Sequence, residues 1–291
     1  MNTTIRKILS FIRWRIVMVR YVTMIKDLRW SKLFRPSPPR MAQTQQIYST
    51  GTASGPSIPQ HELEKIVSIY NPRSMSVVPK LTGHPFTNIF TADDIHEDNP
   101  VFRFAFSREV LDAATDYFGG SLLLDSIQVL YSWPTEGALK ESQLWHLDYG
   151  DTKSFHCVAY LKDVHTAEHG PFVYVNKATT THVGRGWTVR RIPDEKFERL
   201  IGDGQFEYFY GDAGSSVLVD PSACYHYGSR CKVPRLAIFV TFSTLFPFAQ
   251  PIPLVTKNAH RIYEKAKLVR PDLNPSFLQT LLQLDGCNTS A

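Results

Sequence analysis

Two histidines and one aspartate have the residue types and spacing of a catalytic metal site. His146 and Asp148 are separated by a single residue, and His226 follows much later in the chain. In a β-strand the residues i and i+2 point to the same face, so His146 and Asp148 can reach one metal ion together. Two neutral imidazoles and one carboxylate, with the remaining positions open, are typical of non-haem Fe(II) centres. Structural zinc sites instead have four protein ligands, usually including cysteines.

A second candidate is an arginine placed to bind an anion. Arg235 follows His226 by nine residues and begins the apolar run 236–242. A buried cation needs an anionic partner, and a guanidinium group binds a carboxylate with two parallel hydrogen bonds. Arg230 is the alternative anion ligand. It lies in a Gly-Ser-Arg-Cys turn, which favours a solvated side chain. We therefore predict that Arg235 binds a carboxylate.

We assign no catalytic or metal-binding role to the histidines discussed next. His165 and His169 have the i, i+4 spacing of a helical zinc site, but Gly170 and Pro171 follow at once and indicate a turn. The remaining histidines that we interpret as packed or surface side chains are His61, His84, His96, His156 and His260.

Composition indicates an ordinary globular protein with one large domain. The chain has 291 residues, of which 43% are hydrophobic and 20% charged. Its 18 Phe, 13 Tyr and 5 Trp favour many strands. The four cysteines show no CxxC pairing, which indicates reduced thiols in an intracellular enzyme. They are Cys157, Cys224, Cys231 and Cys287.

The net charge of +5 comes from the N-terminal segment. Residues 1–40 hold ten Lys and Arg against one acid, Asp27, whereas the other residues hold 22 basic and 26 acidic side chains. The main body is therefore acidic, and we expect no nucleic-acid binding.

Residues 1–35 form a basic amphipathic segment. Arg6, Arg13 and Arg20 recur every seven residues and fall on roughly one helical face. No uncharged apolar run approaches the ~20 residues that span a bilayer. Three interpretations stay open: a membrane-surface helix, an organelle-targeting segment, or a helix packed on the domain. We expect an intracellular, cytoplasmic protein, with peripheral membrane contact or organelle targeting through residues 1–35 as the alternatives.

The remaining chain divides into a linker and a β-rich domain. Residues 36–60 are rich in Pro, Ser, Thr, Gly and Gln and are typical of a linker. The domain is predicted over residues 61–291. Its expected helices are 63–70, one capped by Ser107 and ending before Gly119, and a C-terminal one over 257–270. The predicted strands are 122–131, 155–162, 171–175, 186–191, 215–219 and 236–242, in the pattern of a sandwich or barrel such as a jelly roll.

The HxD…H…R pattern and its surroundings resemble a known family. Over residues 85–250 the chain is similar to the phytanoyl-CoA dioxygenase family of Fe(II)/2-oxoglutarate-dependent oxygenases. The passages that carry the resemblance, besides the motif itself, are Val158–Val164, Glu168–Val175 and Gly211–Asp220. Two departures stand out. Val175-Asn-Lys-Ala-Thr replaces the family's Pro-Gly-Ser-His, which puts His182 in doubt as a counterpart. Ala237 also lacks the hydroxyl that some relatives place two residues after the arginine.

The resemblance implies a fold and a cofactor set. The fold is mainly β with flanking helices, around a double-stranded β-helix (jelly-roll, cupin-like) core. His146, Asp148 and His226 would bind Fe(II), with 2-oxoglutarate and O2 as co-substrates. Arg235 would hold the distal carboxylate of 2-oxoglutarate. Gln128 and Tyr160 would line the co-substrate pocket.

The implied reaction is hydroxylation of an unactivated C–H bond in a small-molecule or lipid-like substrate, coupled to decarboxylation of 2-oxoglutarate to succinate. The carboxylate of Asp148 favours hydroxylation over halogenation. The alternatives are desaturation, epimerisation or cyclisation at the same iron site, and a catalytically silent jelly-roll binding protein. A cupin-like zinc or manganese enzyme is a third alternative, in which Arg235 would have no co-substrate to bind.

Overall fold

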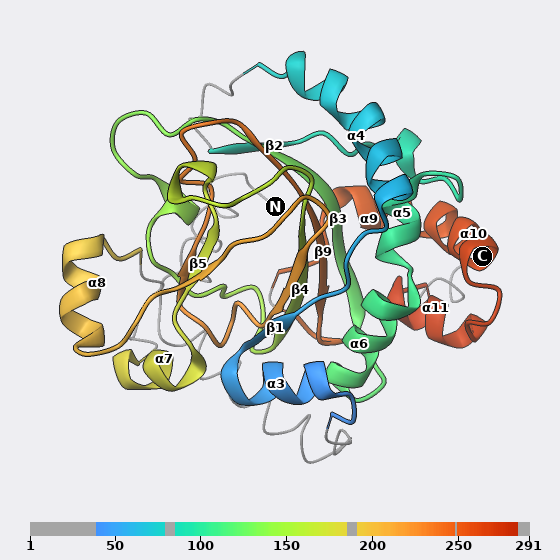
Figure 1. Cartoon of the computed structure of the whole chain (residues 1–291). Helices are drawn as coiled ribbons and strands as arrows, with labels where there is room; N and C mark the ends of the chain where they lie inside the picture. Colours follow the sequence, from blue (N-terminus) through green and yellow to red (C-terminus); the bar gives the residue numbers. More distant parts are fainter. Residues whose placement is uncertain (1–38, 79–84, 185–190, 248, 285–291) are drawn as a thin grey trace, which may run out of the picture.

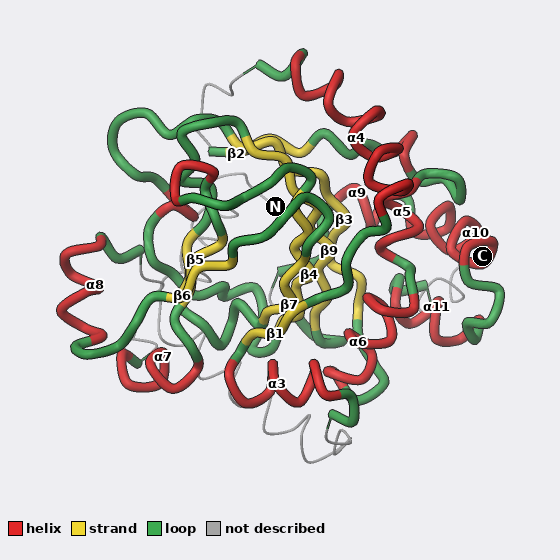
Figure 2. The backbone as a smooth tube through the Cα atoms, in the orientation of Figure 1, coloured by secondary structure: helices red, strands yellow, loops and turns green. Residues whose placement is uncertain are grey.

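Two antiparallel sheets form the centre of the molecule. The computed structural model describes residues 39–78, 85–184, 191–247 and 249–284. The larger sheet has the order β1-β7-β4-β9-β3-β2, and the smaller sheet has the order β6-β5-β8. Figure 2 shows the two sheets side by side. The strands are β1 (Thr52–Ser54), β2 (Phe86–Asn88), β3 (Leu123–Ser132), β4 (Ser154–Tyr160), β5 (Phe172–Tyr174), β6 (Glu207–Phe209), β7 (Ser216–Val219), β8 (His226–Tyr227) and β9 (Arg235–Ser243).

Alternation along the central strands separates an apolar face from a face that lines the interior between the sheets. In β4, Phe155 and Cys157 pack into the main hydrophobic core, whereas His156 and Val158 face the interior cavity. β9 follows the same rule, because residues 236, 238, 240 and 242 belong to the core and residues 235, 239 and 241 line the cavity. This period of two is what a strand with both faces covered requires.

Helices cover the apolar face of the larger sheet. Six of them contribute buried side chains to the same core as the sheet. Figure 1 shows these helices on the β3 side of the larger sheet. In α4 these side chains are Leu63, Ile66 and Tyr70, which share one helical face. The six are α4 (Gln60–Met75), α5 (Pro100–Ala105), α6 (Arg108–Phe118), α9 (Pro253–Lys257), α10 (Ala259–Val269) and α11 (Pro275–Leu281).

The predicted helix boundaries hold at α6. The Ser107 hydroxyl accepts a hydrogen bond from the Val110 amide at 3.3 Å, so the cap works as expected. Gly119 follows the helix in the left-handed conformation, at φ +76°. The helices predicted over 63–70 and 257–270 are confirmed in α4 and α10, although α4 is longer than predicted.

The prediction of a linker over residues 36–60 is wrong for much of that segment. Residues 42–50 form α3 (Ala42–Thr50), and residues 52–54 form β1, which pairs with β7 at the edge of the larger sheet. The polar composition concealed this, because α3 buries only Thr44 and Ile47 and its partner is distant in sequence. The folded unit therefore begins before residue 61.

Two further helices lie beside the smaller sheet, namely α7 (Lys177–Val183) and α8 (Asp194–Ile201) (Figure 1). His182 lies on the exposed side of α7 and takes no part in the interior.

Some predictions fall on residues outside the described ranges. They are the strand over 186–191, apart from Arg191, the interpretations of residues 1–35, and the position of Cys287. Among the described helices, none has the length and apolar character needed to cross a membrane. The three described cysteines are buried.

Candidate metal centre

The structure brings His146, Asp148 and His226 together between the two sheets. His146 and His226 form an antiparallel bridge in which each amide donates to the other's carbonyl at 3.0 Å. The Asp148 amide donates to the carbonyl of Pro221, also at 3.0 Å. The two sequence-distant segments are thus joined through their backbones, and this sets the relative positions of the three side chains.

The ligand atoms of the three side chains lie within 4.8 Å of one another. The Nε2 atoms of His146 and His226 are 3.5 Å and 3.8 Å from the same oxygen of Asp148. Both histidines are buried, and the Asp148 side chain is 34% exposed, so the group opens on the aspartate side. Three ligands on one side, with room on the other, fit a 2-His-1-carboxylate metal centre.

Hydrogen bonds at the far side of each ring select the tautomer that binds a metal. His146 Nδ1 lies 2.7 Å from the carbonyl of Leu144, and His226 Nδ1 lies 3.0 Å from the carbonyl of Cys224. A carbonyl only accepts, so each Nδ1 carries the hydrogen and each Nε2 keeps its lone pair toward Asp148. Both rings therefore present metal ligands and are held in orientation.

The electrostatics favour the same protonation states. Burial, followed by the neighbouring His226, lowers the pKa of His146 to about 3. Burial also lowers the pKa of His226. For Asp148, burial acts to raise the pKa, but His226 and His146 outweigh it, so the pKa lies below the ordinary value. At neutral pH the centre consists of two neutral imidazoles and one carboxylate.

Arg235 lies in the same cavity and has no acidic partner among the described residues. Its side chain is buried, with 4% exposed, and it donates to the carbonyl of Gly170 and, at 3.2 Å, to the hydroxyl of Ser229. Its Nε atom is buried and has no hydrogen-bond partner in the part of the chain that the structure describes. No carboxylate of the described residues lies within 4.0 Å of the guanidinium group. A buried cation in this state calls for an anionic ligand.

Ser229 supplies a hydroxyl that sequence reasoning missed. The alanine at position 237 suggested that the arginine lacks a hydroxyl neighbour, but Ser229 takes that role from the turn after β8. Ser229 has a φ of +59°, a conformation that is uncommon for residues other than glycine and that occurs often at functional sites. Only the fold could have revealed this contact, because the turn conformation places the hydroxyl.

The alternative arginine is already paired. Both terminal nitrogens of Arg230 lie 2.8 Å from the carboxylate of Asp194, and its Nε donates to the carbonyl of Gln143 at 2.6 Å. Its side chain is only 16% exposed, so the expectation of a solvated arginine is wrong. Asp194 already neutralises the charge of Arg230, which leaves Arg235 as the candidate anion ligand.

The zinc alternative finds no support. Residues 167–169 form a single 3-10 turn, and His169 Nδ1 accepts from the His165 amide at 3.1 Å. His165 Nε2 instead lies 2.7 Å from Asp212 in an exposed group with Asp163. The two histidines therefore do not present a shared metal site.

Gln128 and Tyr160 are placed differently. Gln128 faces the cavity from β3, as predicted. Tyr160 lies behind the arginine. Its hydroxyl donates to the carbonyl of Phe209 and accepts from the amide of Phe172, and its ring centroid is 5.9 Å from the guanidinium carbon of Arg235. The prediction that Tyr160 lines the cavity is corrected to a supporting position between β4, β5 and β6.

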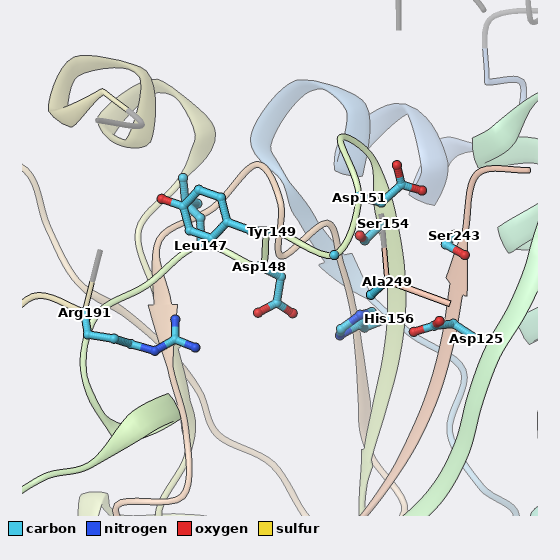
Figure 3. A pocket seen from close by; sticks show the side chains of 11 residues that line it. Asp125, Leu147, Asp148, Tyr149, Asp151, Ser154, His156, Arg191, Ser243 and Ala249 are labelled. Atoms are coloured by element: carbon cyan, nitrogen blue, oxygen red, sulfur yellow. The ribbon is translucent and has the colours of Figure 1, made fainter. Parts of the chain in front are cut away.

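Two cavities meet at the candidate metal centre. The inner cavity, of about 260 Å³, is lined by the three candidate ligands, Arg235 and Gln128. The outer cavity has a volume of about 300 Å³ and is drawn in Figure 3. Three residues line both cavities: Asp125, Asp148 and His156. The arrangement provides one chamber on each side of Asp148.

His156 and Asp125 are site residues that sequence reasoning overlooked. His156 was interpreted as a packed or surface side chain, but it faces Asp148 from β4, and burial lowers its pKa. Burial, together with the charges of Asp151 and Asp148, raises the pKa of Asp125 to about 6. A charged residue within the apolar run 122–131 was the available indication, since it needs a reason to lie there.

A buried carboxylate supports the loop that carries His226. Asp220 accepts hydrogen bonds from the Tyr117 hydroxyl at 2.7 Å and from the amide and hydroxyl of Ser222 at 3.0 Å and 2.6 Å. These bonds tie α6 to the turn between β7 and β8. Because the carbonyl of Pro221 in this turn also accepts from Asp148, the network positions both sides of the metal group.

The architecture is similar to that of solved non-haem iron enzymes. EctD from S. alaskensis, solved with bound Fe, is 16% identical, with 75% of this chain and 83% of that chain covered and a TM-score of 0.54. The carbocyclase SnoK from nogalamycin biosynthesis is 14% identical, with 76% and 89% covered and a TM-score of 0.52. The epimerase SnoN from the same biosynthesis is 14% identical, with 74% and 87% covered and a TM-score of 0.51. No protein-family model matches the sequence.

The chain has the double-stranded β-helix fold. SnoK and SnoN are described as alpha-ketoglutarate (2-oxoglutarate) dependent, and EctD was also solved with 2-oxoglutarate and 5-hydroxyectoine. At these identities the similarity establishes the double-stranded β-helix for this chain, and the chemistry must be argued from its own residues.

Proposed function

We propose that the protein is an Fe(II)- and 2-oxoglutarate-dependent dioxygenase. The observation that carries the proposal is Arg235, a buried guanidinium in the same cavity as His146, Asp148 and His226 that has no acidic partner among the described residues. A metal enzyme independent of 2-oxoglutarate gives no reason to bury such a cation beside the metal. A dicarboxylate that binds the metal at one end meets the guanidinium at the other.

Each residue has a role that follows from its contacts. The Nε2 atoms of His146 and His226 and the carboxylate of Asp148 hold the metal, in tautomers set by the carbonyls of Leu144 and Cys224. Arg235, fixed by Gly170 and Ser229, binds the distal carboxylate of 2-oxoglutarate. When bound, Fe(II) with 2-oxoglutarate and O2 supplies the oxidising power for attack on a substrate C–H bond, with succinate and CO2 as co-products.

Hydroxylation is the outcome that the donor set favours. The metal group retains a carboxylate at position 148, where related halogenases leave a position open for chloride. SnoN is an epimerase and SnoK a carbocyclase on the same architecture, so desaturation, epimerisation or cyclisation is the second candidate outcome. The sequence pattern HxD…H…R further leads us to propose the phytanoyl-CoA dioxygenase family as the nearest group.

Anaerobic reconstitution tests the proposal directly. We expect the protein with Fe(II) and 2-oxoglutarate to show a visible metal-to-ligand charge-transfer band, because 2-oxoglutarate chelates the metal through its keto and carboxylate oxygens. His146→Ala should lose the band. His165→Ala is the matched control, since it removes an exposed histidine that also neighbours aspartates and should leave the band unchanged.

The outcomes separate the candidates. Absence of the band in the wild-type protein, or a band that persists unchanged in His146→Ala, would contradict the proposal. A band that forms without any succinate release, across a panel of candidate substrates, would instead favour the silent binding protein. Product analysis by mass spectrometry distinguishes hydroxylation, which adds one oxygen atom, from desaturation or epimerisation.

A further inference from the structure

The outer cavity beside Asp148 is lined mainly by polar side chains. It has a volume of about 300 Å³, and Arg235 is not among its lining residues. Figure 3 shows Asp125 and Arg191 on opposite sides of Asp148, with His156 and Ser243 next to Asp125. The chamber therefore lies on the other side of the metal group from the proposed co-substrate position. Its lining decides which molecule can be placed next to the metal.

The carboxylate of Asp125 lines this chamber and can accept further hydrogen bonds from a ligand. Its carboxylate accepts one hydrogen bond, from the hydroxyl of Thr241 at 3.2 Å, and no basic side chain of the described residues lies within 4.0 Å of it. Asp151, in contrast, accepts from the amide of Thr152 and from the amide and hydroxyl of Thr244 at 2.6–2.7 Å. Asp151 is thus used in the fold, whereas Asp125 faces the chamber without a counter-charge.

The backbone aims Asp125 into the chamber. The pairing of β3 with β9 shifts between Leu124 and Ser126, so Asp125 is the extra residue of a β-bulge. A bulge redirects the side chain at the point where it occurs, and bulges are frequent beside active sites. In a regular strand Asp125 and Ser126 would point to opposite faces of the sheet. Because of the bulge, both side chains face the cavity.

A second polar group on the same wall has no hydrogen-bond partner among the described residues. The hydroxyl of Ser243 is buried without a hydrogen bond among the described residues. Ser243 lies on β9 opposite Leu123, close to the bulge, and it lines the same chamber. A buried hydroxyl without a hydrogen bond and a buried carboxylate without a counter-charge are costly, so a ligand that supplies donors to both stabilises this wall.

We propose that the outer chamber binds a substrate that carries a protonated nitrogen, which donates to Asp125 and to Ser243. This inference rests on the proposed oxygenase function for the position of the reacting carbon. A divalent metal, Asp148, 2-oxoglutarate and Arg235 together have no net charge, and the charges of Arg191 and Asp151 in the chamber lining cancel, so the charge of Asp125 remains until a cation binds. A lipid-like acyl chain in the same place would leave Asp125 desolvated without a counter-charge and Ser243 without a hydrogen bond.

Three probes of equal shape test the charge preference. Cyclohexylamine, which is protonated at neutral pH, cyclohexanol and cyclohexanecarboxylate share one ring and differ in the polar group. Their affinities are measured by calorimetry on the anaerobic protein loaded with Fe(II) and 2-oxoglutarate. We expect the ammonium probe to bind at least about tenfold more tightly than the alcohol, because hydrogen bonds to charged groups are stronger than neutral ones. Asp125→Asn should abolish this preference.

Matched variants make the result specific. Asp212→Asn makes the same change at an exposed aspartate outside the chamber and should keep the full preference. Ser243→Ala should weaken both the ammonium and the alcohol probe by similar factors. Thermal unfolding of each variant shows that the fold is intact. If Asp125→Asn does not fold, the affinities of the three probes are measured on Asp125→Glu instead. This variant keeps the charge and should retain the preference for the ammonium probe.

The proposal is overturned by failure of the ammonium probe to bind, by equal binding of the amine and the alcohol, or by a preference that survives in Asp125→Asn. Tighter binding of the carboxylate probe would mean that Arg191 determines the charge preference of the chamber, and it would also overturn the proposal. These results leave the oxygenase proposal intact as long as the charge-transfer band forms. Loss of the band in the wild-type protein would refute the oxygenase proposal whatever the probe preference.

Discussion

Arg235→Gln is the substitution that most directly tests how the inner cavity recognises a co-substrate. Glutamine has no charge and keeps an amide nitrogen near the position of the arginine Nε, so the variant removes the charge and retains a polar side chain. In the wild-type protein the guanidinium is buried, with 4% exposed, and no described carboxylate neutralises it. The distal carboxylate of 2-oxoglutarate would be its counter-ion, and the variant should lose that attraction.

The magnitude follows from the burial of the pair. Removing one partner of a buried, hydrogen-bonded charge pair costs about 2–5 kcal/mol, which corresponds to a loss of affinity of roughly 30-fold to several thousand-fold. The dissociation constant is measured by titrating 2-oxoglutarate into the anaerobic Fe(II) protein and following the charge-transfer band. The same titration with 2-oxobutyrate, which lacks the distal carboxylate, should give nearly the same affinity in both proteins.

This pair of ligands distinguishes recognition from damage to the site. Equal losses for 2-oxoglutarate and 2-oxobutyrate would mean that the substitution disturbs the metal group, and an unchanged 2-oxoglutarate affinity would refute the role of Arg235. Arg230→Gln is the control. It breaks the ion pair with Asp194 and is expected to lower stability, without changing the ratio of the two affinities.

Three further substitutions test the surroundings of the site. Asp125→Asn should stabilise the metal-free protein at pH 7.5 by up to about 3 kcal/mol. Burial raises the pKa of Asp125 to about 6, so the wild-type carboxylate is charged at pH 7.5 and this buried charge destabilises the folded state. The difference should shrink as pH falls through 6 and vanish below the unfolded value near 3.9, and urea unfolding curves that differ equally at all pH values would contradict it. Gly170→Ala should lower the thermal midpoint and weaken 2-oxoglutarate binding, because Gly170 has a φ of +68°, an added Cβ would lie 2.7 Å from Cys231, and its carbonyl binds Arg235; unchanged values of both quantities would show that the turn can adjust. Asp220→Asn should lower the free energy of unfolding in urea by about 1–3 kcal/mol and reduce Fe(II) affinity. The reason is that the amide NH2 would face a hydroxyl group that now donates a hydrogen bond to the carboxylate. A variant with wild-type stability would refute this positioning role.

The strand order explains why some elements were predictable and others were not. Strands β3, β4, β7 and β9 were predictable within one or two residues, because long apolar runs with covered faces are a local property of the chain. The segment 42–54 was not, since β1 is a strand only through its pairing with β7, and its composition by itself is typical of a linker. A short edge strand takes its stability from a partner far away in sequence.

The chemistry of the metal group was determined by the sequence itself. His146, Asp148 and His226 have the residue types of metal ligands, and the i, i+2 spacing places two of them on one face in any extended segment. Arg235 was predictable for a similar reason, because a cation at the head of an apolar strand implies a buried charge. These inferences need only the side chains and the local backbone.

The tertiary structure alone decided which polar groups remain available for ligands. Arg230 and Arg235 are equivalent in type, and only the fold gives one of them a carboxylate partner, Asp194, and withholds one from the other among the described residues. The hydroxyl of Ser229 and the bulge at Asp125 likewise depend on contacts between distant segments. The availability of a buried charge is set by its neighbours in space, and a single sequence contains no direct record of them.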